Sequence, residues 1–181
     1  MSSMNTMSRR DFVSLAFGVG LSVALPSVSS ASGAARKLSF YNLHTEEKVS
    51  LTYSENGRYL PDAIQELDHF MRDFRTGDVH TINPALYDQL HRLQAMVQSP
   101  GAFHVISGYR SSKTNKTLNE HSNGVAKQSL HMQGRAIDVR LPGKDLKHLH
   151  KAALAMAAGG VGYYPESDFI HLDTGRVRHW G

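Results

Sequence analysis

Two segments of the sequence, residues 129–138 and 168–173, concentrate side chains that can bind a metal ion. Each contains a run with strand character, and side chains alternate between the two faces of a strand. Asp138 and His171 therefore point away from the apolar neighbours that a core would bury. If the two strands lie together, both side chains project from the same face. His131 then reaches the same point from the loop that precedes the first strand.

Two imidazoles and one carboxylate form a donor set that suits zinc and leave a fourth position for water. Gly134 allows the chain to turn sharply between His131 and Asp138. Water at such a site has a strongly lowered pKa, and a neighbouring carboxylate can accept its proton during attack on a carbonyl. The alternative is that both histidines are ordinary surface or half-buried residues and that Asp138 caps a turn. With eleven histidines in the chain, spacing alone does not decide between the two interpretations.

Composition excludes several other kinds of site. The 181 residues contain no cysteine, which excludes disulfides, thiolate zinc sites, iron–sulfur clusters and a cysteine nucleophile. Hydrophobic residues make up 40% of the chain, enough for a sizeable core. Lysine and arginine number 20 against 16 acidic residues. This mild basic excess does not favour nucleic acid as a partner.

The N-terminal residues have the composition of an export signal. Arg9 and Arg10 precede an uncharged apolar run, residues 15–25, that is too short to span a membrane comfortably. Small residues around Ala31 suit a signal peptidase, and the pattern resembles a twin-arginine signal. We therefore expect residues 1–31 to be removed and residues 32–181 to form a single periplasmic domain without a membrane span. An uncleaved membrane anchor is the alternative.

The rest of the chain alternates between strand and helix patterns. A hairpin is expected over 38–43 and 48–53, and further strands over 103–107, 136–141, 161–164 and 169–172; helices are expected over 61–77, 83–100 and 146–156. Residues 111–130 read as a surface connection with a short helix over 117–121, and such long connections are often functional. Together these strands and helices predict an α+β fold, with a small antiparallel sheet and helices.

Several motifs together are more selective than any one of them. Ser129-x-His131-x-x-Gly134-x-Ala136-x-Asp138, a later His171 and an earlier Ser107-Gly108-Tyr109-Arg110 resemble the zinc peptidases grouped as lysostaphin, D-Ala-D-Ala metallopeptidases and sonic hedgehog. Within that group the chain is most similar to the YcbK-like (MepK) murein endopeptidases. The similarity covers essentially the whole mature chain, including residues 42–45, 124–127, 159–165 and 178–180. It implies a hedgehog-like or D-Ala-D-Ala metallopeptidase-like fold.

The resemblance also implies roles for individual residues. His131, Asp138 and His171 are implied to hold zinc, and the substrate is implied to be a peptide stem or cross-link of peptidoglycan. Arg110, from the Ser-Gly-Tyr-Arg motif, is implied to bind a substrate carboxylate or the developing oxyanion, since a guanidinium donates two parallel hydrogen bonds. The alternative for Arg110 is a structural role in the loop around Ser111.

One position departs from the D-Ala-D-Ala enzymes, which carry a glutamate as catalytic base three residues before the last histidine ligand. Asp168 occupies that position here. Aspartate performs the same proton transfer with a side chain one methylene shorter. Asp168 is therefore the candidate base, with Glu166 and Asp173 as substitutes.

These features predict an exported zinc metallopeptidase that hydrolyses amide bonds in peptidoglycan cross-links. The resemblance further suggests a bond between two diaminopimelate residues. A D-Ala-D-Ala carboxypeptidase or dipeptidase is the alternative enzyme. A module that keeps zinc and binds peptidoglycan without turnover is the alternative from another class.

Overall fold

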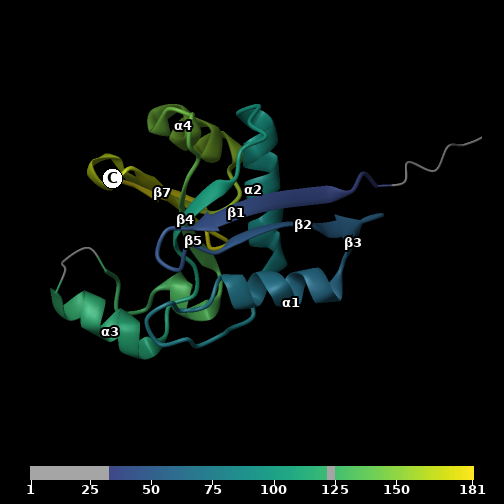
Figure 1. Ribbon diagram of the computed structural model, residues 1–181. Coiled ribbons are helices and arrows are strands. Elements are labelled where there is room, and N and C mark those ends of the chain that lie inside the picture. Colours follow the sequence, from purple (N-terminus) through teal and green to yellow (C-terminus); the bar gives the residue numbers. More distant parts are fainter. Residues whose placement is uncertain (1–32, 122–124) are drawn as a thin grey trace, which may run out of the picture. The chain divides into compact units, whose positions relative to one another are not determined.

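The computed structural model describes residues 33–121 and 125–181, and the predicted export signal lies outside them. The described residues contain eight strands: β1 (Arg36–Asn42), β2 (Lys48–Glu55), β3 (Arg58–Tyr59), β4 (Phe103–Ser107), β5 (Ala136–Arg140), β6 (Gly160–Tyr164), β7 (Phe169–Asp173) and β8 (Arg178–Trp180). They also contain four α-helices, α1 (Pro61–Phe70), α2 (Pro84–Met96), α3 (Ser112–His121) and α4 (Leu146–Met156), and two 3-10 helices, η1 (Leu130–Gln133) and η2 (Pro165–Ser167). The predicted α+β class is confirmed (Figure 1).

The strands form one sheet in the order β3-β2-β1-β4-β5-β7-β6-β8. Most neighbours are antiparallel, but β1 pairs with β4 and β6 pairs with β8 in parallel. The prediction of an antiparallel sheet is therefore wrong, and the sheet is mixed. The physical reason is the long crossover through α1 and α2, which brings the chain back beside β1 in the same direction.

One face of the sheet packs against helices. Asn83 caps α2 by accepting a hydrogen bond from the Ala85 amide at 3.0 Å, as expected for a helix opened by Asn-Pro. In Figure 1, α2 and α4 lie beside each other over the sheet. The core combines strand residues (Val105, Ile137, Val139, Ile170, Leu172) with helix residues (Leu90, Leu93, Leu149, Ala153). The opposite face, which carries Asp138 and His171, is called the site face below.

Two helices differ in extent from the sequence-based expectation. Helix α1 ends at Phe70 rather than near Gly77. There the chain forms a tight loop in which the Gly77 amide donates to the Asp73 carbonyl at 2.7 Å. Helix α2 ends at Met96, four residues before the predicted end at position 100. Helix α4 has the predicted bounds, and its C-cap residue Ala157 adopts a left-handed conformation with φ 48°.

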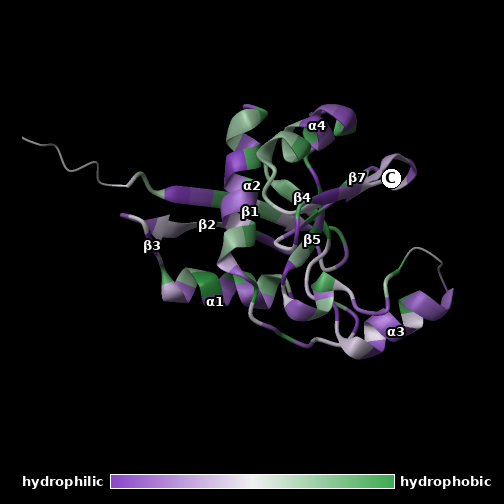
Figure 2. Cartoon of the chain, turned by 180° about the vertical axis from the view of Figure 1, so that it is seen from behind, coloured by the Kyte–Doolittle hydropathy of each residue, from purple (hydrophilic) through white to green (hydrophobic). Residues whose placement is uncertain are grey.

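Helix α3 is longer than predicted and has little apolar surface, as its mainly hydrophilic colouring in Figure 2 shows. Hydrogen bonds take the place of an apolar stripe. The Ser111 hydroxyl accepts from the Thr114 amide at 3.2 Å, and the Asn115 side chain donates to the carbonyls of Ala126 and Lys127 at 3.1 and 3.2 Å. Helix α3 thereby holds the segment that leads to His131.

None of the helices in the described part of the chain combines the length and the apolar character that crossing a membrane requires.

Candidate metal centre

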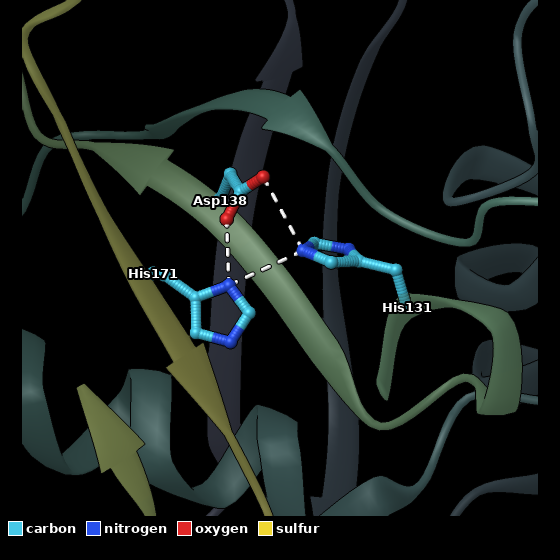
Figure 3. A group of neighbouring side chains, drawn as sticks. All are labelled: His131, Asp138 and His171. Atoms are coloured by element: carbon cyan, nitrogen blue, oxygen red, sulfur yellow. Dashed lines mark hydrogen bonds and ion pairs between the residues drawn. The ribbon is translucent and has the colours of Figure 1, made fainter. Parts of the chain in front are cut away.

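The structure brings His131, Asp138 and His171 together (Figure 3). Asp138 on β5 and His171 on β7 are directly opposed in the antiparallel register, as strand alternation predicted. His131 enters from η1, and Gly134 ends that helix in a left-handed conformation with φ 63°. A side chain on Gly134 would overlap the carbonyl oxygen of Thr81, so both the turn and its packing require glycine.

The spacing of the three donors matches a small tetrahedral ion. His131 Nε2 lies 3.2 Å from His171 Nδ1 and 3.3 Å from Asp138 Oδ2, and His171 Nδ1 lies 2.9 Å from Asp138 Oδ1. Zinc bonds of about 2.0–2.1 Å in a tetrahedron place neighbouring ligand atoms about 3.3 Å apart. All three residues are at least nine-tenths buried. The donor set therefore fits zinc in both chemistry and dimension.

Both imidazoles are oriented by hydrogen bonds on their other nitrogen. His131 Nδ1 donates to the Gly108 carbonyl at 2.7 Å, and His171 Nε2 donates to Asp173 Oδ2 at 3.1 Å. Such bonds fix the tautomer and leave the opposite nitrogen free to bind a cation. The remaining nitrogens, His131 Nε2 and His171 Nδ1, are the two that converge on Asp138.

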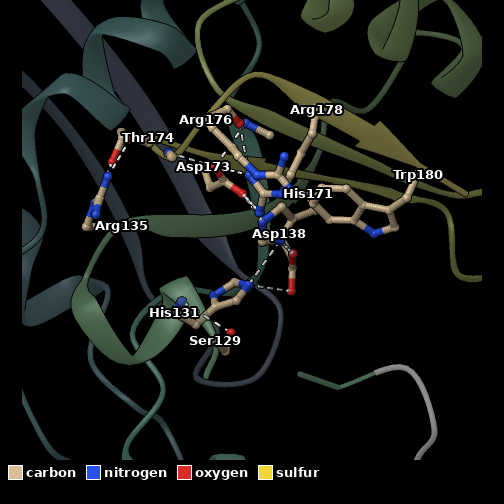
Figure 4. A network of polar contacts seen from close by, with 12 residues as sticks. Ser129, His131, Arg135, Asp138, His171, Asp173, Thr174, Arg176, Arg178 and Trp180 are labelled. Atoms are coloured by element: carbon tan, nitrogen blue, oxygen red, sulfur yellow. Dashed lines mark hydrogen bonds and ion pairs between the residues drawn. The ribbon is translucent and has the colours of Figure 1, made fainter. Parts of the chain in front are cut away.

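Asp173 is the centre of a buried network behind His171 (Figure 4). Its carboxylate accepts from the amides of Gly160 and Gly175 at 2.9 and 2.8 Å, and from the Arg178 guanidinium at 2.7 and 3.1 Å. Although burial raises the pKa of Asp173, the hydrogen bonds from His171 and Arg178 outweigh burial and hold that pKa below its usual value. Asp173 is therefore an ionised anchor for His171.

The electrostatics of the three donors favour a cation between them. Burial raises the pKa of Asp138, but the two adjacent imidazoles outweigh it and lower that pKa. Burial lowers the pKa of His131. For His171 burial also lowers the pKa, but hydrogen bonds to Asp138 and Asp173 prevail and raise it to about 9. Two carboxylates thus flank one imidazole, and positive charge at this point is stabilised.

The cluster lies in a cleft of about 460 Å³. Its walls include Tyr164, Phe169 and Trp180, together with residues that follow α3. The Trp180 ring lies 5.1 Å from the His171 ring, between ring centres, and its indole nitrogen donates to the Tyr164 hydroxyl at 2.9 Å. A Cβ on Gly162 would come within 2.7 Å of the Trp180 ring, so the absence of a side chain there lets the indole lie beside His171.

Arg110 also reaches the cleft. Its guanidinium lies 3.6 Å from Asp138 Oδ2 and 3.3 Å from the Ser107 hydroxyl. Among the described residues, its Nε has no hydrogen-bond partner although it is buried. Arg110 therefore brings a positive charge with unused hydrogen-bonding capacity to the edge of the candidate metal centre.

Asp168 is placed differently from the other predicted site residues. It immediately precedes Phe169, but its side chain is 61% exposed and pairs with the Arg140 guanidinium at 3.1 Å. The residues that line the cleft do not include it. Of its two substitutes, Glu166 lies exposed in η2, and Asp173 is completely buried behind His171.

Comparison with known proteins then identifies the family, because residues 30–180 match the family described as peptidoglycan L,D-endopeptidase MepK. The chain belongs to this family. Peptidoglycan L,D-endopeptidase MepK of Escherichia coli strain K12 is 46% identical over 145 residues, 80% of each chain. The probable peptidoglycan L,D-endopeptidase MepK of Haemophilus influenzae is 42% identical over 146 residues, 80% of this chain and 78% of the relative. The predicted resemblance to murein endopeptidases is confirmed, and the chain is a peptidase of that family.

Sequence reasoning did not find the supporting residues of this family member. The sequence patterns predict Asp173 only as a substitute base, and they include Arg178 only in a C-terminal motif. The spacing His171-Leu172-Asp173 carried a signal, since residues two apart on a strand share a face. The contribution of Arg178 depends on the pairing of β8 with β6, which no local pattern indicates.

Proposed function

We propose that this chain is a zinc-dependent endopeptidase that hydrolyses L,D-amide bonds in the peptide cross-links of peptidoglycan, such as a bond between two diaminopimelate residues. The single observation that carries the proposal is the buried convergence of His131, Asp138 and His171 at the base of a cleft in a chain of this family. The same assignment makes residues 32–181 one zinc peptidase domain with a hedgehog-like or D-Ala-D-Ala metallopeptidase-like fold.

In this proposal His131, Asp138 and His171 hold the zinc ion. Bound zinc supplies Lewis acidity, which activates water at neutral pH and polarises a substrate carbonyl. Gly108 and Asp173 orient the two imidazoles through their second nitrogens. The aromatic wall of the cleft excludes bulk water and strengthens electrostatic interactions inside it.

Arg110 is assigned to the substrate. Its guanidinium donates hydrogen bonds either to a carboxylate of the peptide or to the carbonyl oxygen as that atom gains negative charge. The buried Nε, which has no partner among the described residues, is a donor available for this purpose. The bond to Ser107 and the ion pair with Asp138 hold the guanidinium at the edge of the centre.

Asp168 is assigned as the base that accepts a proton from the attacking water. This requires its side chain to rotate away from Arg140 and toward the cleft that begins at the next residue, Phe169. The rotation costs little free energy, because the side chains of Arg140 and Asp168 are 36% and 61% exposed. Such surface ion pairs contribute about 0–1 kcal/mol to stability. Catalytic hydrogen bonds often form only in the substrate complex.

The proposal also covers the export of the protein from the cytoplasm. Residues 1–31, with Arg9 and Arg10 before an apolar run, act as a twin-arginine signal that is cleaved after export. The mature enzyme then works in the periplasm, where its polymeric substrate lies. N-terminal sequencing of the protein recovered from the periplasm tests the cleavage site.

The central experiment incubates the purified zinc-loaded protein with cross-linked muropeptides. Cleavage of the cross-link that disappears with a chelator and with His171→Ala supports the proposal. His148→Ala, on the exposed side of α4, is the matched control and retains activity. Release of terminal D-alanine alone would indicate a carboxypeptidase. Stoichiometric zinc and binding to peptidoglycan without cleavage would indicate a binding module and overturn the enzymatic assignment.

The base assignment has its own test. Asp168→Asn is expected to lose rate while it retains zinc. Glu166→Gln, two residues away and also exposed, is expected to change neither the rate nor zinc binding. A general base typically contributes about 10²–10⁴-fold to rate. If Asp168→Asn cleaves muropeptides as fast as the unaltered enzyme, another group accepts the proton.

A further inference from the structure

Six side chains from six neighbouring strands form a line across the site face. In strand order they are Lys48 on β2, Tyr41 on β1, His104 on β4, Arg140 on β5, Phe169 on β7 and Tyr164 on β6. The register pairs Tyr41 with Lys48, Tyr41 with His104, His104 with Arg140, and Tyr164 with Phe169. The β5–β7 register, which pairs Val139 with Ile170, continues to Arg140 and Phe169. We call these six residues the cross-strand row.

Side chains at each end of the row contact one another. The Lys48 ammonium lies 5.5 Å from the centre of the Tyr41 ring, and the Tyr41 and His104 rings meet edge to face at 5.0 Å. At the other end, the Phe169 and Tyr164 rings stack at 4.5 Å. All six side chains are exposed or partly exposed. The row is therefore accessible surface on which each cationic side chain is followed by two aromatic rings.

One end of the row lies inside the cleft, and the other end lies outside it. Phe169 and Tyr164 line the cleft of the metal centre. A second hollow, between His104 and Arg140, also contains Lys144, and a third contains Tyr41, Lys48 and His104. His104 borders both outer hollows, so these two hollows adjoin each other along the row toward β2.

We propose that the cross-strand row is a second binding region of this protein, which holds a carboxylate-bearing peptide stem of peptidoglycan where the stem runs out of the cleft. The inference rests on the proposed function, because the cleft must hold the cross-link for its stem to continue along the row. Lys48, Lys144 and Arg140 bind carboxylates, and the rings of Tyr41, His104 and Phe169 pack against aliphatic parts of the stem.

Charge and length both favour this occupant. Within the outer hollows, Lys48, Arg140 and Lys144 oppose the single carboxylate of Asp168. Strands lie about 4.8 Å apart, so the five steps from Tyr164 to Lys48 cover about 24 Å. About seven extended residues reach that far. A stem peptide together with part of its cross-link has this length, and neutral sugars offer no partner for three cations.

The test measures binding rather than cleavage, so it does not depend on turnover. A fluorescent, sugar-free dimer of two cross-linked stem peptides and a truncated dipeptide that contains only the cross-linked residues are titrated onto the full protein. Both titrations are made with zinc and with chelator. Lys48→Gln should weaken binding of the dimer about fivefold, the upper range for one exposed charge contact. Binding of the dipeptide should not change.

Matched variants keep the result interpretable. Lys48 is exposed, so its replacement removes charge without disturbing the core. Lys147→Gln makes the same change on the exposed side of α4 and should bind both peptides normally. Tyr41→Ala added to Lys48→Gln should weaken binding of the dimer further. The effect of Lys48 should also shrink at high salt, because exposed charges are screened.

Three results would overturn the inference. Unchanged binding of the dimer by Lys48→Gln would remove the row from the binding surface. An equal loss of affinity for the dipeptide in Lys48→Gln would indicate a general change of the fold. A loss that occurs only when glycan is attached to the stems would assign the row to sugar. Failure of the proposed function looks different, because the zinc-loaded protein would then bind the dimer through the row without cleaving it.

Discussion

Replacing Asp173 by asparagine tests whether the candidate metal centre depends on the network behind it. The exchange keeps size and shape but removes the charge that receives the Arg178 guanidinium and the Nε2 proton of His171. Both carboxylate oxygens accept hydrogen bonds: Oδ1 accepts from the Gly160 and Gly175 amides, and Oδ2 accepts from His171 Nε2 and Arg178. The NH₂ of asparagine must take one of these two positions, so at least one buried donor loses its acceptor. Asparagine therefore cannot reproduce the set of bonds.

The expected magnitude has two parts. Loss of supporting bonds to a metal ligand typically weakens metal binding about 10–100-fold, equivalent to about 1.4–2.7 kcal/mol. Unpaired buried donors and the lost charge-assisted bonds lower the free energy of unfolding by about 3 kcal/mol. For a chain of this size, that loss corresponds to a fall in Tm of about 6–12 °C in the metal-free protein.

The assay separates the two parts. Zinc affinity is measured by competition with a chromophoric chelator, and Tm is measured with and without zinc. Asp145→Asn is the matched control, because Asp145 caps α4 through the His148 amide at 2.8 Å and asparagine caps equally well. If Asp173→Asn loses stability but binds zinc as tightly as the unaltered protein, the reasoning that Asp173 positions His171 is refuted.

Three further predictions concern stability. Gly134→Ala should lower the free energy of unfolding by at least about 2 kcal/mol in urea titrations, because alanine disfavours φ 63° and its Cβ meets the Thr81 carbonyl; a smaller loss would show that the turn relaxes. Burial raises the pKa of Asp73, but hydrogen bonds from Thr114 and Ser111 outweigh it and lower that pKa. Its stabilisation is therefore complete above the unfolded pKa of about 4 and is lost as the pH falls through the lower folded value. In chelator, the stability gap between the unaltered protein and Asp73→Asn should be large at pH 7 and shrink toward pH 3, and a constant gap would contradict this. Finally, zinc at one hundred times its Kd should stabilise the protein by about 2.7 kcal/mol, visible in calorimetry and reversed by chelation; no shift would mean that the folded protein binds no zinc.

Local patterns predicted the geometry of the donors better than that of their surroundings. Alternation along two short strands placed Asp138 and His171 on one face, because one face of each strand is buried by β-branched and aliphatic side chains. The glycine at 134 correctly indicated a sharp turn. These features depend on residues close in sequence.

Features that depend on distant pairing could not be predicted. The parallel match of Phe40 with Phe103 joins strands separated by two helices, and no periodicity encodes it. The full length of helix α3 could not be predicted, because Asn115 bonds to carbonyls beyond its end stabilise it rather than an apolar stripe. The position of the Asp168 carboxylate depends on the rotamer of an exposed side chain, which the sequence does not specify.

The space beside His171 is shaped by a missing side chain. Gly162 leaves room for the indole of Trp180, so the identities of positions 162 and 180 are not independent. A methyl group gained at 162 must be accommodated by a smaller or displaced ring at 180. Across the evolutionary history of the family these two positions should therefore change together, and a library that randomises both at once should contain active combinations that stepwise substitution never reaches.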